Sequence, residues 1–248
     1  MNTETKILKD IATLPVFSDL GTKELDGLLS LAQVRNYKKG KTLFRQGEEV
    51  TNLYFVIDGW VKVYKGSNSG DEAILQICGD GDILMAPSVF LDIPALASGQ
   101  LVQDSKVLSL PAAAIRKEVT LNGKLAVNII HSLSVYSQEL IQKIEHSQLM
   151  TAAERVGWFL LKLSIQQSQG MQAVIKLPFD KSTIAAYLDM TPETFSRTLK
   201  QFKAKGFQIK SGTIVKPMPN ALCGFCDEGL ALECAAINCT MKTGRKTC

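Results

Sequence analysis

The sequence has 248 residues, of which 46% are hydrophobic and 21% are charged, so a packed core is expected and a disordered chain is excluded. This length allows two modest domains. No uncharged apolar run is long enough to span a bilayer, and the opening residues MNTETKILKD contain no apolar signal region. A cytoplasmic protein is therefore expected.

The net charge of +4 is distributed unevenly along the chain. Residues 151–220 contain ten Lys and Arg against four Asp and Glu, a net charge of +6, and residues 221–248 contain three of each kind. Residues 1–150 therefore carry −2. Because basic segments attract polyanions, residues 151–220 are the candidate nucleic-acid-binding part, with a solvated basic face as the alternative.

The first 120 residues indicate a small β domain behind a short helical lead-in. Apolar residues fall at roughly helical spacing over residues 14–31. From residue 34 to residue 110 the pattern changes to short strands separated by glycine turns: TLFRQGEEV, NLYFVIDGWVKVYK, EAILQIC and SKVLSL. This pattern predicts a β-roll or jelly roll over residues 1–120.

Helical spacing returns at about Pro111 and continues to Met150. Within it, apolar and small residues recur in steps of four and three, as in a coiled-coil seam. We predict a dimerisation helix over residues 121–150, with a helix packed only on its own barrel as the alternative. The predicted interface residues are Ile130, Leu133, Leu140 and Ile144.

Residues 151–218 show the order of a winged helix-turn-helix domain. A helix over 151–168 and the strand AVIKLPF precede two short helices, residues 182–188 and 192–205. Thr191 is a favoured helix cap, Pro192 suits the first helical position, and Gly206 suits the helix end. The segment FQIKSGTIVKP then predicts a glycine-turned hairpin, or wing.

The second short helix has an apolar face and a polar face, which we call its chemical face because it carries the hydrogen-bonding and charged side chains. Phe195, Leu199 and Phe202 recur at core spacing. The chemical face suits the DNA major groove, because glutamate accepts from cytosine, arginine forks onto guanine, and lysine binds phosphate. An ordinary amphipathic surface helix is the alternative. The predicted DNA-binding residues are Thr191, Glu193, Ser196, Arg197 and Lys200.

The order of barrel, long helix and winged helix-turn-helix resembles the CRP/FNR transcription regulators, over about residues 14–218. The glycines of KKGKTLFRQGEEVTNLYFVIDGWVKVYK, at positions 40, 47 and 59, are similar to the effector-domain pattern of that family. The segment ETFSR, residues 193–197, looks like the recognition motif of the FNR branch. The resemblance implies an α+β homodimer that binds palindromic double-stranded DNA with TTGAT-like half-sites, and RNA polymerase is a candidate partner.

The residues argue against a cyclic nucleotide as the effector. The family's nucleotide-binding members carry Gly-Glu and Arg-Ser pairs, whereas GDGDILMAPSVFLDIPALASGQLVQ contains neither, and no arginine occurs between Arg45 and Arg116. A buried phosphate would then lack a guanidinium partner. The segment GDGDIL is also no dinucleotide fingerprint, because it lacks the third glycine and opens no clear helix.

The cysteines indicate a metal site in a tail that covers residues 219–248. In a reducing cytoplasm, clustered thiols are more typical of metal binding than of disulfides. FNR-type sensors usually carry N-terminal cysteines, but this chain has none before Cys78, which is expected in the core. We expect an iron–sulfur cluster, with zinc, a thiol switch or no metal as alternatives. The candidate ligands are Cys223, Cys226, Cys234 and Cys239, with Cys248 as a further one.

Haem is another effector used in this family, so the two histidines are candidate axial ligands. Both His131 and His146 fall on the long helix, where a polar helix-face residue is the expected role, and His131 is the better candidate. The sequence contains no catalytic Cys/His/Asp grouping and no phosphate loop, so an enzyme is not expected. A redox- or gas-sensing transcription regulator is the predicted function, with a zinc-stabilised DNA-binding protein as the alternative.

Overall fold

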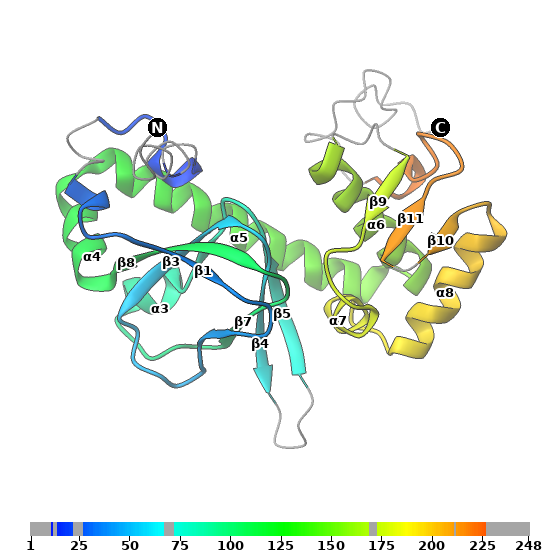
Figure 1. The fold of residues 1–248 in the computed structure, drawn as a ribbon, viewed down its shortest axis with the longest axis horizontal. Coiled ribbons are helices and arrows are strands. Elements are labelled where there is room, and N and C mark those ends of the chain that lie inside the picture. The colour runs from blue at the N-terminus through cyan, green and yellow to red at the C-terminus, as the bar shows by residue number, and fades with distance from the viewer. Residues whose placement is uncertain are drawn as a thin grey trace. The chain divides into compact units, whose positions relative to one another are not determined.

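The computed structural model describes residues 11, 14–21, 27–66, 72–168, 173–210 and 212–226. The chain divides into two compact units, residues 1–141 and residues 142–248, and the division lies within one long helix (Figure 1). Among the described residues, no helix is long and apolar enough to cross a membrane.

The strands of the first unit confirm the predicted β-roll. Within the described residues they form two four-stranded antiparallel sheets, in the orders β1-β8-β3-β6 and β2-β7-β4-β5. Val56, Leu84 and Val107 of the first sheet pack against Phe44 and Val61 of the second, so the two sheets face each other. The strands are β1 (Gln33–Tyr37), β2 (Thr42–Phe44), β3 (Asn52–Asp58), β4 (Val61–Gly66), β5 (Glu72–Cys78), β6 (Ile83–Leu84), β7 (Ser98–Leu101) and β8 (Ser105–Pro111).

Tight turns link these strands, and glycine makes them possible. Gly40, Gly47 and Gly59 have φ values of 84°, 82° and 107°, a region that side chains with a Cβ rarely enter. At Gly59 a Cβ would also lie 2.2 Å from the Oγ of Ser105. The glycine pattern that carried the family resemblance therefore has a direct steric cause.

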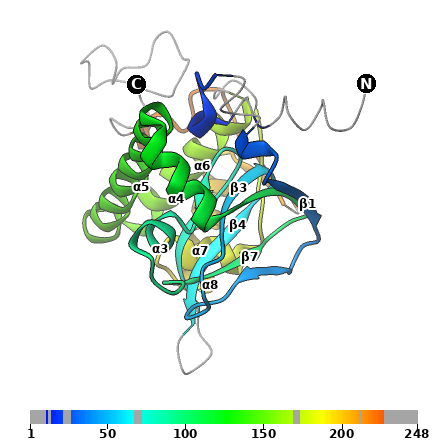
Figure 2. The same ribbon diagram turned by 90° about the vertical axis from the view of Figure 1, so that its left-hand side faces the viewer.

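The helices of the first unit are η1 (Pro15–Phe17), α3 (Ala86–Leu91), α4 (Ala112–Leu121) and the first part of α5 (Gly123–Leu149). Figure 2 shows the helices α3, α4 and α5 to the left of the strands of the first unit. As expected, GDGDIL does not itself open a helix: its last two residues form β6, and α3 begins only after Met85. The helix predicted from about residue 111 is not continuous: Asn122 is extended, and its Oδ1 accepts 3.1 Å bonds from the N–H groups of Lys124 and Leu125.

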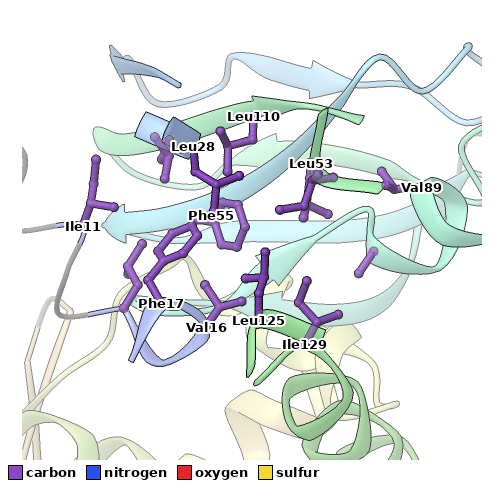
Figure 3. Packing of buried hydrophobic residues seen from close by; sticks show 14 of the residues in the cluster. Ile11, Val16, Phe17, Leu28, Leu53, Phe55, Val89, Leu110, Leu125 and Ile129 are labelled. Carbon is purple, nitrogen blue, oxygen red and sulfur yellow. The ribbon is translucent and has the colours of Figure 1, made fainter. Parts of the chain in front are cut away.

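Helices and sheet meet in a continuous apolar core (Figure 3). Phe55 of β3 lies at its centre, fully buried, with the Phe17 ring centroid 5.1 Å from its own. Leu125 and Ile129 of α5 enter the same cluster. The start of α5 is therefore part of the β-roll's own core.

The second unit has the predicted winged helix-turn-helix order. Its elements are the end of α5, then α6 (Ala152–Ser168), β9 (Val174–Lys176), α7 (Lys181–Tyr187), α8 (Pro192–Ala204), β10 (Gln208–Lys210), β11 (Thr213–Val215) and η2 (Cys223–Phe225). In the described part of this unit, the strands pair antiparallel in the order β10-β11-β9. The β10–β11 hairpin directly after α8 is the predicted wing.

Candidate nucleic-acid interface

Two capped helices form the helix-turn-helix. Asp180 caps α7, where its Oδ1 accepts from the N–H of Thr183 at 2.9 Å. Burial opposes ionisation of Asp180, but the bonds from Ser182 and Thr183 outweigh it and lower the pKa of this carboxyl. Thr191 caps α8, because its Oγ1 accepts from the N–H of Thr194 at 3.2 Å. The hydroxyl oxygen of Thr191 therefore caps the N-terminus of α8, directly after the turn between the two helices.

One face of α8 fixes the helix in the second unit. Phe195, Leu199 and Phe202 are buried, as their spacing predicted, and Thr198 joins them. Gly206 follows the C-cap residue Lys205 and terminates the helix: its φ of 91° is left-handed, and its N–H donates to the Lys203 carbonyl at 3.0 Å. Packing and caps together set which residues α8 presents to solvent.

The opposite face of α8 carries the predicted recognition residues. Glu193, Ser196, Arg197 and Lys200 are all exposed, and their spacing of three, four and seven places them on one stripe of the helix. The backbone N–H of Glu193 itself and the Thr191 side chain lower the pKa of the Glu193 carboxyl. We call these four residues the α8 stripe.

The cysteine-rich tail is only partly described. Cys223 and Cys226 lie at the start of the η2 turn and directly after it, and both are partly exposed. Cys234, Cys239 and Cys248 lie outside the described residues. Within the part of the chain that the structure does describe, no three His, Cys, Asp or Glu side chains gather as a metal site would require.

A cavity of about 490 Å³ opens within the first unit, between the strands and α5. Its walls are largely apolar, with contributions from Phe44, Leu84 and Met85. Three carboxylates and one lysine supply its charged lining: Asp80, Asp82, Glu139 and Lys65. Asp80 and Asp82 are tied down by the N–H groups of Gly59 and Gly79, at 2.9 Å and 2.8 Å. Burial raises the pKa of Asp80, against the Gly59 hydrogen bond.

The two histidines have different surroundings. His131 is exposed and lines the cavity, together with Tyr136 of the same helix. His146 is buried, and its ring meets the Trp158 ring at a centroid distance of 4.6 Å and an angle of 68°. The expectation of a polar helix-face role is therefore wrong for His146, which packs in the second unit.

The predicted dimer seam on α5 is divided between two faces. Ile130 and Ile144 are exposed, at 61% and 59%, but Leu133 packs partly against the core around Phe55. The predicted seam did not include Val127 and Ile141, which are also exposed. They lie at heptad spacing on the same face of α5 as Ile130 and Ile144. These four residues form an exposed apolar stripe, interrupted by Ser134 and Ser137, that nothing in the described chain covers.

Comparison with known proteins gives two family matches. Residues 34–121 match the cyclic nucleotide-binding domain, and residues 154–225 match the Crp-like helix-turn-helix domain. A relative from Bacillus subtilis named anaerobic regulatory protein is 25% identical, covering 79% of this chain and 84% of its own. The fumarate and nitrate reduction regulatory protein of Vibrio cholerae is 29% identical, covering 78% of each chain.

Solved structures agree in fold. A regulatory protein from Silicibacter pomeroyi, described as cAMP-binding, matches with a TM-score of 0.62 and 27% identity over 87% of this chain and 97% of its own. FixK2 from Bradyrhizobium japonicum matches with a TM-score of 0.71 at 22% identity, over 79% of this chain and 98% of its own. The chain belongs to the CRP/FNR family of DNA-binding transcription regulators, and its named relatives are regulators rather than enzymes.

Proposed function

We propose that this protein is a homodimeric regulator that reads a DNA palindrome with TTGAT-like half-sites. The α8 stripe carries this proposal, because it combines a carboxylate acceptor, a hydroxyl and two cations on one exposed helix face. Arg197 suits a guanine edge and Glu193 a cytosine amino group. Lys200 lies further along the helix and suits a phosphate.

The exposed stripe on α5 supports the dimer. Val127, Ile130, Ile141 and Ile144 would remain in water in a monomer, and a second copy of the helix would cover them. A two-fold dimer presents two copies of α8, which explains why the proposed site is a palindrome. RNA polymerase remains a candidate partner of the bound dimer.

We further propose that the signal enters through the tail. Cys223 and Cys226 fit a thiolate-bound centre, because a single turn brings both to the surface of the DNA-binding unit. With Cys234 and Cys239 they would hold an iron–sulfur cluster, whose chemistry supplies sensitivity to oxygen or NO. Zinc on the same thiolates is the alternative and would make the tail structural.

A cluster-independent alternative is a haem in the cavity. His131 is the candidate axial ligand, because it lines a largely apolar space beside Tyr136 and Met85. A cyclic nucleotide fits this space poorly, since its phosphate would meet three carboxylates and one lysine. The two arginines that flank this region in the sequence form ion pairs with other residues: Arg45 lies 3.6 Å from Glu48, and Arg116 lies 2.8 Å from Asp92.

Cys226→Ala, purified without air, is expected to lose the visible absorption of the cluster and to bind specific DNA more weakly while remaining a dimer. One ligand fewer prevents the thiolates from closing around the iron. Absorption spectra, iron and acid-labile sulfide analysis, and sedimentation test the three parts of this expectation. Zinc without sulfide in the wild-type protein would favour the structural alternative.

Cys78→Ala is the matched control, because Cys78 is buried between the two sheets of the β-roll. This variant should keep both the cluster and the response of DNA binding to air. If Cys226→Ala binds specific DNA as tightly as the wild type, with and without air, the tail is not the sensor. The haem alternative at His131 would then take its place.

Cyclic AMP at millimolar concentration is expected to leave the melting temperature unchanged. A ligand at 100 times its Kd would add about 2.7 kcal/mol to the stability of the unit that binds it, which calorimetry detects readily. Inorganic phosphate at the same ionic strength is the control. A saturable rise with cyclic AMP alone would overturn the proposal that the cavity excludes nucleotides.

A further inference from the structure

The segment that leads from the wing to the cysteines is packed into the DNA-binding unit. Lys216 follows β11 and is 5% exposed. Its Nζ donates to the Oγ of the buried Ser164 of α6 at 3.1 Å and to the carbonyl of Pro219 at 3.2 Å. Leu222 is 1% exposed. The chain up to the η2 turn is therefore held by side chains that face inward.

The η2 turn inserts an aromatic ring into a notch on α6. At Gly157 an added Cβ would come within 2.4–2.6 Å of three ring carbons of Phe225, so only glycine leaves room for this ring. The Phe225 ring centroid also lies 5.7 Å from that of Phe202 on α8. We call this place the Gly157 notch, and through it the turn touches both α6 and α8.

The same turn carries both described tail cysteines. The N–H of Cys226 donates to the carbonyl of Cys223 at 3.1 Å, and the N–H of Phe225 donates to that of Leu222 at 3.0 Å. Phe225 is the residue directly before Cys226, so the ring and the two thiols share one short, hydrogen-bonded piece of backbone. A change in the conformation of this turn must move the ring.

We propose that Phe225 is the positioning residue that couples the state of Cys223 and Cys226 to the recognition helix α8. Bonds from the two thiolates to a metal centre hold the turn in its hydrogen-bonded form, so the ring stays in the notch against Phe202. Loss of those bonds removes this restraint. A ring that leaves the notch opens a void beside Phe202, which destabilises the packing of α8.

The coupling rests on the proposed metal centre, whereas the position of the Phe225 ring in the Gly157 notch does not depend on it. Two variants disturb the ring without changing any cysteine. Gly157→Ala expels the Phe225 ring sterically, and Phe225→Ala removes it, while every cysteine stays. Gly224→Ala is the matched control, because a Cβ at this position on the same turn meets nothing within 4 Å.

The first measurement is the ratio of specific DNA affinities of anaerobically loaded and metal-stripped protein. In the wild type and in Gly224→Ala this ratio should be about 5- to 150-fold, the usual range of coupling between sites. In Gly157→Ala and Phe225→Ala it should fall to within about twofold of unity, with iron and sulfide contents unchanged. A wild-type ratio in both ring variants would overturn the role of Phe225.

The second measurement uses iodoacetamide on metal-stripped protein, with the alkylation rates of Cys223 and Cys226 read by peptide mass spectrometry. Both rates should rise in the two ring variants and stay at the wild-type value in Gly224→Ala, because an unseated turn exposes its thiols. Unchanged alkylation rates in the two ring variants would show that the Phe225 ring does not hold the turn in place. If the wild-type protein contains no metal but the alkylation rates rise in the ring variants, the proposed sensor and the coupling are both overturned. Only the packing of Phe225 in the Gly157 notch would then stand.

Discussion

Arg197→Ala is expected to reduce the preference of the protein for the specific palindrome over the same duplex with its half-site guanine replaced. The expected reduction is about 5- to 150-fold, which corresponds to about 1–3 kcal/mol. The residue is exposed on the α8 stripe, with the buried Phe195 and Leu199 fixing the helix beneath it. Alanine removes the fork that distinguishes guanine and leaves that packing unchanged. Competition binding with the two DNA duplexes at one fixed salt concentration measures the loss.

Lys200→Ala provides the matched control on the same stripe. A lysine that binds phosphate supplies affinity without sequence preference, so this variant should weaken both duplexes alike. It should also reduce the slope of log affinity against log salt by about 1. Equal loss on both duplexes in Arg197→Ala would remove base reading from Arg197.

Phe195→Ala is expected to destabilise the DNA-binding unit by about 3–5 kcal/mol. The ring is 0% exposed and lies on the same face of α8 as Leu199 and Phe202. Its removal leaves a cavity that the neighbouring side chains fill only partly. In a unit of this size such a loss lowers the melting temperature by more than about 10 °C.

Calorimetry tests this expectation, because the two compact units can melt in separate transitions. The melting temperature of the unit of residues 142–248 should fall, and the melting temperature of the β-roll should stay unchanged. Met218→Ala is the control, since Met218 is a large apolar residue of the same unit that is 56% exposed. Its effect should lie within about 0.5 kcal/mol of zero. A small shift in Phe195→Ala would show that the core of α8 tolerates the void.

The sequence predicted the features that depend on local chemistry. Thr191 as a cap, Gly206 as a helix end and Phe195 as a core residue follow from rules that operate within one or two helical turns. The alternation of strands and glycine turns likewise predicted the β-roll. What these rules share is that the partner of each residue lies close to it in sequence, so the pattern alone identifies the pair.

The features that the sequence did not reveal depend on partners far apart in the chain. The fit of Phe225 against Gly157 joins residues 68 positions apart, and periodicity does not contain such a pair. The residue type of His146 predicts a position on a polar helix face, yet the side chain is buried, with its ring against that of Trp158. The position of Leu133 on α5 also depends on the β-roll core, which is why the predicted seam included it and left out Val127.

The inward-facing Lys216, Leu222 and Phe225 also determine where the DNA-binding unit can be cut. A fragment that ends after the wing would remove the Phe225 ring from the Phe202 ring and expose an apolar surface on α6 and α8. The amine of Lys216 would lose the carbonyl of Pro219 as well. An isolated DNA-binding domain that keeps its solubility should therefore extend at least to Cys226, and a purification tag belongs beyond the tail.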